Sequence, residues 1–191
     1  MMDCEHRQGG DVIMDRITVN GREFRVLRLL GKGKGGYSYL AENERGQYVV
    51  KQIHHEPCAY YTFGDKLASE CHDYERLSAL GLAMPELLAV DQTQERLLKA
   101  YVPGETMDRL ILRDEVPEEA RQQLRAMCEL LYLSGLNIDY FPTNFIFYQG
   151  RLYYIDYECN AYMSEWDYEH WGRKYWYRTE KFLAHFQQKK E

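Results

Sequence analysis

The chain has 191 residues, of which 45% are hydrophobic and 28% are charged, with a formal net charge of −6. This composition is that of a globular protein, and the length suffices for one domain or two small lobes with a buried core. The acidic balance argues against direct nucleic-acid binding, because proteins that bind a phosphate backbone need a basic face.

The cysteines and the hydropathy pattern indicate a reduced, soluble, cytoplasmic protein without a membrane partner. The five cysteines are scattered and form no C-x-x-C pair, so neither a zinc site nor a disulfide framework is expected. No apolar run suits a signal peptide or a membrane span. Residues 1–15 are polar and are expected to form a flexible leader.

The first half of the chain has the pattern of antiparallel strands. Hydrophobic residues alternate around Asn20-Gly21, a strong signal for a hairpin turn, and a second hairpin is expected around Glu44-Arg45-Gly46. Apolar spacing over residues 64–80 then predicts a helix. Two strand-like segments follow, "PELLAV" and "ERLLKAYV".

The second half is predicted to be mostly helical. A helix is expected to start at Pro117 and to end at Gly135, and two short strands are expected on either side of Gly150. An aromatic helix is expected over residues 164–188. The boundary near Pro103-Gly104 divides the chain into an N-terminal lobe of residues 16–102 and a C-terminal lobe of residues 103–191.

The aromatic residues of the expected last helix are predicted to pack a small lower core, and their polar edges would offer a surface for a protein partner. These rings are Trp166, Trp171, Tyr175, Phe182 and Phe186.

The stretch "LLGKGKGGYSYLA", residues 29–41, has the glycine content of a phosphate-binding loop. A dinucleotide-binding fingerprint would have to open a helix, whereas alternating strand residues follow here. A Walker A loop needs a lysine where Tyr37 stands. The glycine-rich hairpin of kinases needs strand, loop and strand, with a lysine on the next strand, and Lys51 is placed accordingly. The kinase loop fits best, and a plain surface turn is the alternative.

The segment "GKGKGGYSYLAENERGQYVVKQI" resembles the first strands of the protein-kinase-like superfamily. The resemblance implies that Gly31, Gly33 and Gly36 cover the ATP phosphates and that Lys51 holds the α- and β-phosphates. Glu70, in the predicted helix, matches the glutamate that keeps this lysine ordered in the family. Glu75 is the alternative partner.

The segment "LLKAYVPGETM" resembles the hinge between the two lobes of that family. The resemblance implies that Lys99 is the gatekeeper residue. It also implies that the backbone groups of Ala100 and Val102 bind adenine.

The segment "LNIDYFPTNFIFYQGRLYYIDYE" resembles the catalytic loop and the metal-binding strand of the same superfamily. The resemblance implies that Asp139 lies beside the attacking hydroxyl, and that Asn144 and Asp156 hold Mg²⁺. Glu158 would add a further metal contact. Phosphoryl transfer depends on positioning and charge neutralisation, and Mg²⁺ prefers a few hard oxygen ligands, so these residue types suit the chemistry.

The sequence departs from the protein kinases at three places. Asn137-Ile138 stands where they have His-Arg, Tyr157-Glu158 follows Asp156 in place of Phe-Gly, and only 35 residues follow Asp156. The chain is therefore most similar to minimal atypical kinases: the RIO-like kinases and the lipopolysaccharide, aminoglycoside and choline kinases.

The resemblance implies an α+β, protein-kinase-like bilobal fold with a truncated C-terminal lobe. It implies an ATP- and Mg²⁺-dependent phosphotransferase that acts on a hydroxyl of a protein Ser/Thr or of a small molecule. The loss of the histidine before Asp139 leaves a second hypothesis, a nucleotide-binding pseudokinase that regulates a partner. A scaffold that binds no nucleotide is the third.

Overall fold

The structure is a computed structural model that describes residues 15–33, 35–56 and 64–187. Nearly all of the predicted leader lies outside these ranges. The chain divides into two compact units: Met1–Leu67 with Glu86–Tyr101, and Ala68–Pro85 with Val102–Glu191. Each unit has its own buried core.

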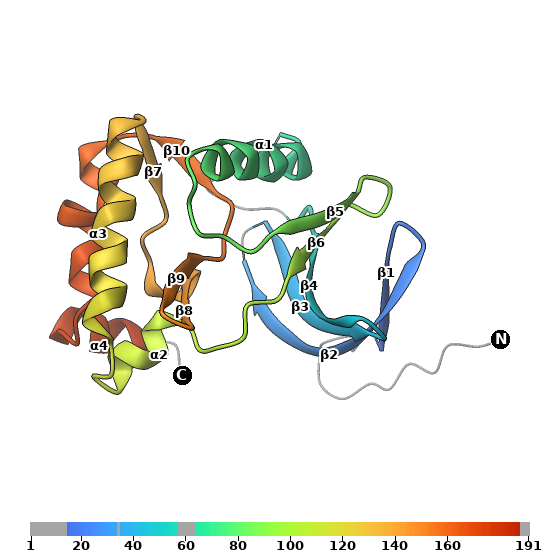
Figure 1. Cartoon of the computed structure of the whole chain (residues 1–191), viewed down its shortest axis with the longest axis horizontal. Helices are drawn as coiled ribbons and strands as arrows, with labels where there is room; N and C mark the ends of the chain where they lie inside the picture. The colour runs from blue at the N-terminus through green and yellow to red at the C-terminus, as the bar shows by residue number, and fades with distance from the viewer. Residues whose placement is uncertain (1–14, 34, 57–63, 188–191) are drawn as a thin grey trace. The chain divides into compact units, whose positions relative to one another are not determined.

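The first unit is a curled antiparallel sheet of six strands in the order β1-β2-β3-β4-β6-β5 (Figure 1). Its strands are β1 Arg16–Val19, β2 Arg22–Lys32, β3 Gly36–Asn43, β4 Gly46–Ile53, β5 Leu87–Asp91 and β6 Arg96–Ala100. Both predicted hairpins are present. Asn20 and Gly21 turn the first with φ of 49° and 74°, a left-handed pair that Asn-Gly tolerates well.

Helix α1, Lys66–Ala79, forms where the sequence predicts a helix. From Ala68 onward it groups with the second unit. The Tyr74 ring lies 4.7 Å from that of Tyr157, and the Asp73 carboxylate accepts the Cys159 N–H at 3.2 Å. The division into lobes of residues 16–102 and 103–191 remains a prediction.

Ahead of its aromatic tail, the second unit contains two further helices and two small antiparallel sheets. The helices are α2 Met107–Leu112 and α3 Glu118–Leu133, and the strands are β7 Leu136–Ile138, β8 Phe145–Tyr148, β9 Arg151–Tyr154 and β10 Cys159–Ala161. Helix α3 begins after Pro117 and ends before Gly135, as predicted, and lies against β7 and β9. The β8–β9 hairpin is the one predicted around Gly150, whereas the β7–β10 pair was not predicted.

The prediction of one helix over residues 164–188 is wrong. Three short segments come first, with 3₁₀ geometry at Ser164–Trp166, π geometry at Tyr168–Gly172 and 3₁₀ geometry at Arg173–Tyr175. Within the described tail, the α-helix is α4, Glu180–Gln187. A new turn starts at Asp167 because its carboxylate accepts the His170 N–H at 2.8 Å.

The aromatic spacing of this tail reflects tertiary packing rather than one helical face. Phe182 is fully buried, as predicted for a core residue, and so is Trp176. Trp171 and Tyr175 are half-buried, while Trp166 keeps 56% of its surface exposed. The Phe186 side chain lies outside the described part of the chain.

An antiparallel sheet followed by a helix-rich unit confirms the predicted α+β fold class. Within the described ranges, no helix is both long and apolar enough to cross a membrane.

Candidate functional site

The β8–β9 hairpin brings the two predicted metal ligands to the same end of one small sheet. Phe145 pairs with Tyr154, so Asn144 precedes one strand where Ile155 follows the other. The Ile155 N–H donates to the Asn144 carbonyl at 2.9 Å. Asp156 is the next residue, and it therefore leaves the hairpin beside Asn144.

Asp139 joins this pair through the turn that follows β7. The side-chain Nδ2 of Asn144 donates to the Asp139 carbonyl at 3.3 Å. The Asp139 carboxylate accepts the Phe141 N–H at 3.0 Å through Oδ1, and the Asn144 N–H closes the turn onto the Phe141 carbonyl at 2.9 Å. Short-range hydrogen bonds thus connect Asp139 with Asn144 and orient the carboxylate within its own loop.

The chemistry of this donor set fits Mg²⁺. Because Asn144 uses Nδ2 as a donor toward Asp139, its Oδ1 is the atom that can act as a ligand. Asp156 adds a carboxylate whose Oδ1 accepts the Tyr157 N–H at 2.9 Å. Among the residues that the structure describes, no three His, Cys, Asp or Glu side chains form a metal-binding group. A few protein oxygens suit a magnesium ion that takes its other ligands from phosphate and water.

Tyr154 lies among these acids, and sequence reasoning missed it. Its side chain is fully buried, and its hydroxyl donates to the Glu158 carbonyl at 2.9 Å. Burial raises the pKa of this phenol well above its ordinary value, and the charges of Asp156, Asp139 and Glu158 raise it further. No motif marks the residue; its one sequence signal is its place two residues before Asp156.

Asn137 stands at one of the three places where the sequence departs from the kinase pattern. The side chain is buried, and its Nδ2 donates to the Met163 carbonyl at 2.8 Å. Its Oδ1 has no hydrogen-bond partner among the described residues. Asn137 thus ties β7 to the segment after β10.

The predicted glycine loop joins β2 to β3 in the first unit, and its glycines are not equivalent. A Cβ on Gly36 would lie 2.4 Å from the Gln52 carbonyl oxygen, so packing against β4 requires a glycine there. A Cβ on Gly31 would meet nothing within 4 Å, and one on Gly33 would meet only the Gly36 carbonyl oxygen, at 3.9 Å. Packing among the described residues therefore does not account for Gly31 and Gly33.

His54, which directly follows β4, contacts the backbone of the glycine loop. Its Nε2 lies 3.1 Å from the Gly33 carbonyl oxygen, and its Nδ1 accepts the Glu56 N–H at 3.3 Å. Because Nδ1 accepts, Nε2 carries the proton and donates to Gly33. The His54 side chain is half-buried, whereas that of His55 is exposed.

Glu56 ties together the two strands that flank the loop. Its carboxylate pairs with the Lys32 ammonium at 2.8 Å and accepts the Tyr37 hydroxyl at 2.5 Å. These two hydrogen bonds, that from Lys32 first, lower the pKa of Glu56 to about 2. Tyr37, which stands where a Walker A loop would need a lysine, therefore helps to hold the two flanking strands together.

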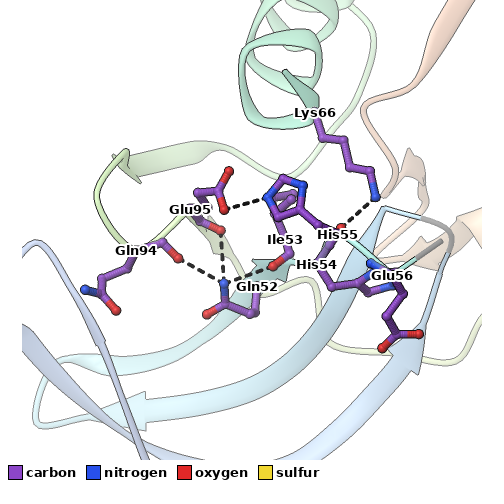
Figure 2. A network of polar contacts seen from close by, with 8 residues as sticks. All are labelled: Gln52, Ile53, His54, His55, Glu56, Lys66, Gln94 and Glu95. Carbon is purple, nitrogen blue, oxygen red and sulfur yellow. Dashed lines mark hydrogen bonds and ion pairs between the residues drawn. The ribbon is translucent and has the colours of Figure 1, made fainter. Parts of the chain in front are cut away.

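Figure 2 shows the polar network that anchors this end of β4. Lys66 donates to the His54 carbonyl at 2.6 Å, and the His55 ring lies 2.7 Å from a Glu95 carboxylate oxygen. Gln52 donates to the Gln94 carbonyl at 2.9 Å. Its neighbour Lys51, on β4, pairs with Ser38 on one side and Leu97 on the other.

The remaining predicted contacts would join residues of different units. Lys51 belongs to the first unit and Glu70 to the second, and Ala100 and Val102 are divided in the same way. Their pairing and their contacts with a nucleotide stay predictions. Within the first unit, the Ala100 N–H donates to the Glu86 carbonyl at 2.8 Å, so this amide is engaged.

No protein-family model and no curated protein matches the chain. Among solved structures, it is similar to the PknI kinase domain of Mycobacterium tuberculosis, at 16% identity. One match has a TM-score of 0.47 and covers 76% of this chain and 63% of that domain. A second, to a mutant of the domain, has a TM-score of 0.49 and covers 77% and 63%.

The chain thus spans less than two thirds of the length of these kinase domains. At this level of similarity, function has to be argued from the residues of the chain itself.

Proposed function

We propose that the protein is an ATP- and Mg²⁺-dependent phosphotransferase that transfers the γ-phosphate to a hydroxyl group. The observation that carries the proposal is the hydrogen-bonded arrangement of Asp139, Asn144 and the strand that ends before Asp156. This arrangement lies within one unit, and it combines a candidate base with two candidate metal ligands.

Each residue has a role that its chemistry suits. Asp139 orients the acceptor hydroxyl and takes its proton, while Asn144 and Asp156 hold Mg²⁺. Gly31, Gly33 and Gly36 cover the phosphates, and Lys51, kept ordered by Glu70, binds them. The backbone groups of Ala100 and Val102 bind adenine. Bound Mg·ATP supplies the phosphoryl group.

Two features of the first unit support a nucleotide beside the glycine loop. Gly31 and Gly33 have no packing reason to be glycine among the described residues, and a missing Cβ lets a backbone approach phosphate closely. The contacts of His54 and Glu56 hold the flanking strands in place. A preorganised loop lowers the cost of ordering on binding.

The acceptor is a protein Ser/Thr or a small hydroxylated molecule in the cytoplasm, as for the atypical kinases that the sequence resembles. The second candidate function is that of a pseudokinase, which binds nucleotide and regulates a partner, with the aromatic tail as a candidate surface. Asn137 favours the pseudokinase, because it stands where the kinase family has a histidine next to the catalytic aspartate. Its side-chain amide donates to the Met163 carbonyl instead.

Turnover of ATP, followed as ADP formation with Mg²⁺, tests the proposal. Asp139→Asn should lower kcat by about 10²–10⁴-fold, because it removes the base. Asp156→Asn should abolish turnover, because it removes the metal carboxylate. Asp114→Asn is the matched control, since Asp114 is exposed and its φ of 58° suits asparagine. Mg²⁺-dependent ATP binding without turnover in the wild type would favour the pseudokinase, and turnover that survives Asp156→Asn would refute the assigned site.

A further inference from the structure

We propose that Asp73 is a positioning residue, which orients Glu70 by fixing helix α1 to strand β10. The inference rests on the proposed phosphotransferase function, in which Glu70 keeps the phosphate-binding Lys51 ordered. It adds a residue to that site, because the sequence pattern assigns no role to Asp73 or to its partner Cys159.

The Asp73 carboxylate uses both of its oxygens toward Cys159. Oδ2 accepts the Cys159 backbone N–H at 3.2 Å, and Oδ1 accepts the Cys159 thiol at 3.2 Å. Arg76, three residues later in α1, lies 3.3 Å from the same Oδ1, and 16% of the Asp73 side chain is exposed. Hydrogen bonds to an ionised carboxylate are stronger than those between neutral groups, and partial burial reduces their screening by water.

Cys159 is the fixed end of this contact. It belongs to β10 and pairs with Ile138 on β7, the strand that leads into the turn with Asp139. Its side chain is buried, and this burial, followed by the hydrogen bond to Asp73, raises the pKa of the thiol to about 12. The thiol therefore keeps its proton at neutral pH and acts as the donor to Asp73.

The contact determines how α1 is turned about its own axis. Leu77 is fully buried and holds the helix against the core of the second unit, but apolar contacts are not directional. The hydrogen bonds of Asp73 are directional, so they favour one rotation of the helix. Glu70 lies three residues before Asp73 and therefore on the same side of α1. A rotation of α1 that moved Asp73 away from Cys159 would turn Glu70 with it.

Asp73 thereby connects the helix of Glu70 with the segment of Asp156. Cys159 follows Asp156 by three residues, as Asp73 follows Glu70. In the proposed reaction, Asp156 holds the Mg²⁺ and Glu70 orders the lysine that bind the same phosphates. The helix and the metal-binding segment must therefore keep a fixed relation. A shift of about 1 Å at such a site can cost roughly 10²-fold in rate.

Asp73→Ala removes both bonds to Cys159, and Asp91→Ala is the matched control. The Asp91 carboxylate also accepts two hydrogen bonds, but it lies in the first unit and has no role in the proposed reaction. Each variant loses hydrogen bonds to a carboxylate, so both should unfold at a lower temperature. The Cys159 amide should exchange its hydrogen about tenfold faster in Asp73→Ala, because it loses its acceptor, and should keep nearly its wild-type rate in Asp91→Ala.

A double-mutant cycle measures whether Asp73 acts through Glu70. In ATP turnover, Asp73→Ala should lower kcat by about tenfold to a hundredfold and change KM for ATP by less than about twofold. In a Glu70→Gln background, Asp73→Ala should lower kcat by less than about twofold, because the carboxylate that it orients is already gone. Asp91→Ala should keep the wild-type kcat.

A second pair of variants tests the contact from its other end. Cys159→Ala removes the thiol bond alone and should lower kcat by about threefold to tenfold, as expected for the loss of one hydrogen bond. Cys159→Ser keeps a donor toward Asp73 and should stay within about twofold of the wild type. This pair decides the matter if Asp73→Ala does not fold.

Unchanged exchange at Cys159, equal losses of kcat in Asp73→Ala and Asp91→Ala, or losses that multiply in full in the double variant would overturn the role of Asp73. Equal kcat in Cys159→Ala and Cys159→Ser would do the same. Each of these results leaves the proposed function standing. Wild-type protein that shows no turnover would overturn the proposed function and, with it, this inference.

Discussion

Gly31 and Gly36 belong to the same glycine-rich hairpin, but only Gly36 packs against other backbone. Gly36→Ala should lower the free energy of unfolding by about 1–3 kcal/mol, because the added Cβ would meet the Gln52 carbonyl oxygen at 2.4 Å. Gly31→Ala, with open space around its Cβ, should leave stability nearly unchanged. Thermal unfolding of both variants checks the pair, and a Gly36→Ala protein as stable as the wild type would contradict this packing.

Asp91 joins two turns of the first unit, and its contribution to the stability of the fold should depend on pH. Its carboxylate accepts the Asn20 N–H at 2.6 Å and the Gln94 N–H at 2.9 Å, and these bonds, that from Asn20 first, lower its pKa. A carboxyl whose folded pKa is lowered stabilises fully above its unfolded pKa of about 3.9, and this stabilisation is lost as the pH falls through the folded pKa.

Asp91→Asn should therefore be less stable than the wild type at pH 7, and the difference should shrink as the pH is lowered below about 3.9. Urea unfolding of both proteins across this range measures the difference directly. A gap that stays constant with pH would show that the ionised carboxylate is not what matters at this position.

Helix α4 has an N-cap residue, because the first N–H groups of a helix find no acceptor within the helix itself. Thr179 precedes the helix, and its hydroxyl oxygen accepts the Phe182 N–H at 3.2 Å while its proton goes to the Lys174 carbonyl at 2.9 Å. Thr179→Ala should cost about 1 kcal/mol in denaturant unfolding, the usual cost of a lost N-cap. Thr179→Ser, which keeps the hydroxyl, should behave like the wild type, and equal losses in both variants would argue against capping.

The elements that were predicted correctly are those that local chemistry determines. Asn20-Gly21 requires a left-handed turn, and Pro117 and Gly135 mark the two ends of α3. The elements that were missed depend on distant partners. Strand β7 pairs with β10, twenty-one residues apart at Ile138 and Cys159, and three residues of each carry no periodicity that could reveal the pairing.

The prediction of one helix over residues 164–188 was wrong for a related reason. Its aromatic residues recur at nearly helical intervals, but Asp167 caps a new turn, and a Cβ on Gly172 would lie 2.7 Å from that of Tyr140. Contacts with a segment about thirty residues earlier in the chain therefore set the local conformation, and propensity was overridden by packing.

At the scale of the whole molecule, the sequence identified the side chains that could take part in the reaction. It did not identify the side chains whose hydrogen bonds fix the surrounding backbone. Asp139 and Asn144 could be found because a motif spaces them, and a side-chain hydrogen bond connects them. Tyr154 and His54 belong to no motif, and their roles follow from which backbone atoms their side chains reach. Such contacts arise from the packed structure, so spacing in one sequence does not reveal them.

The proposed function requires that the protein binds ATP through a magnesium ion held by Asp156. The most direct measurement is thermal unfolding of the wild type and Asp156→Ala with ATP, each with and without Mg²⁺. A ligand at a hundred times its Kd stabilises by roughly 2.7 kcal/mol, which corresponds to a rise of several degrees in Tm. We expect a rise in Tm that requires Mg²⁺ and disappears in Asp156→Ala. No rise at millimolar ATP, or an equal rise in the variant, would contradict it.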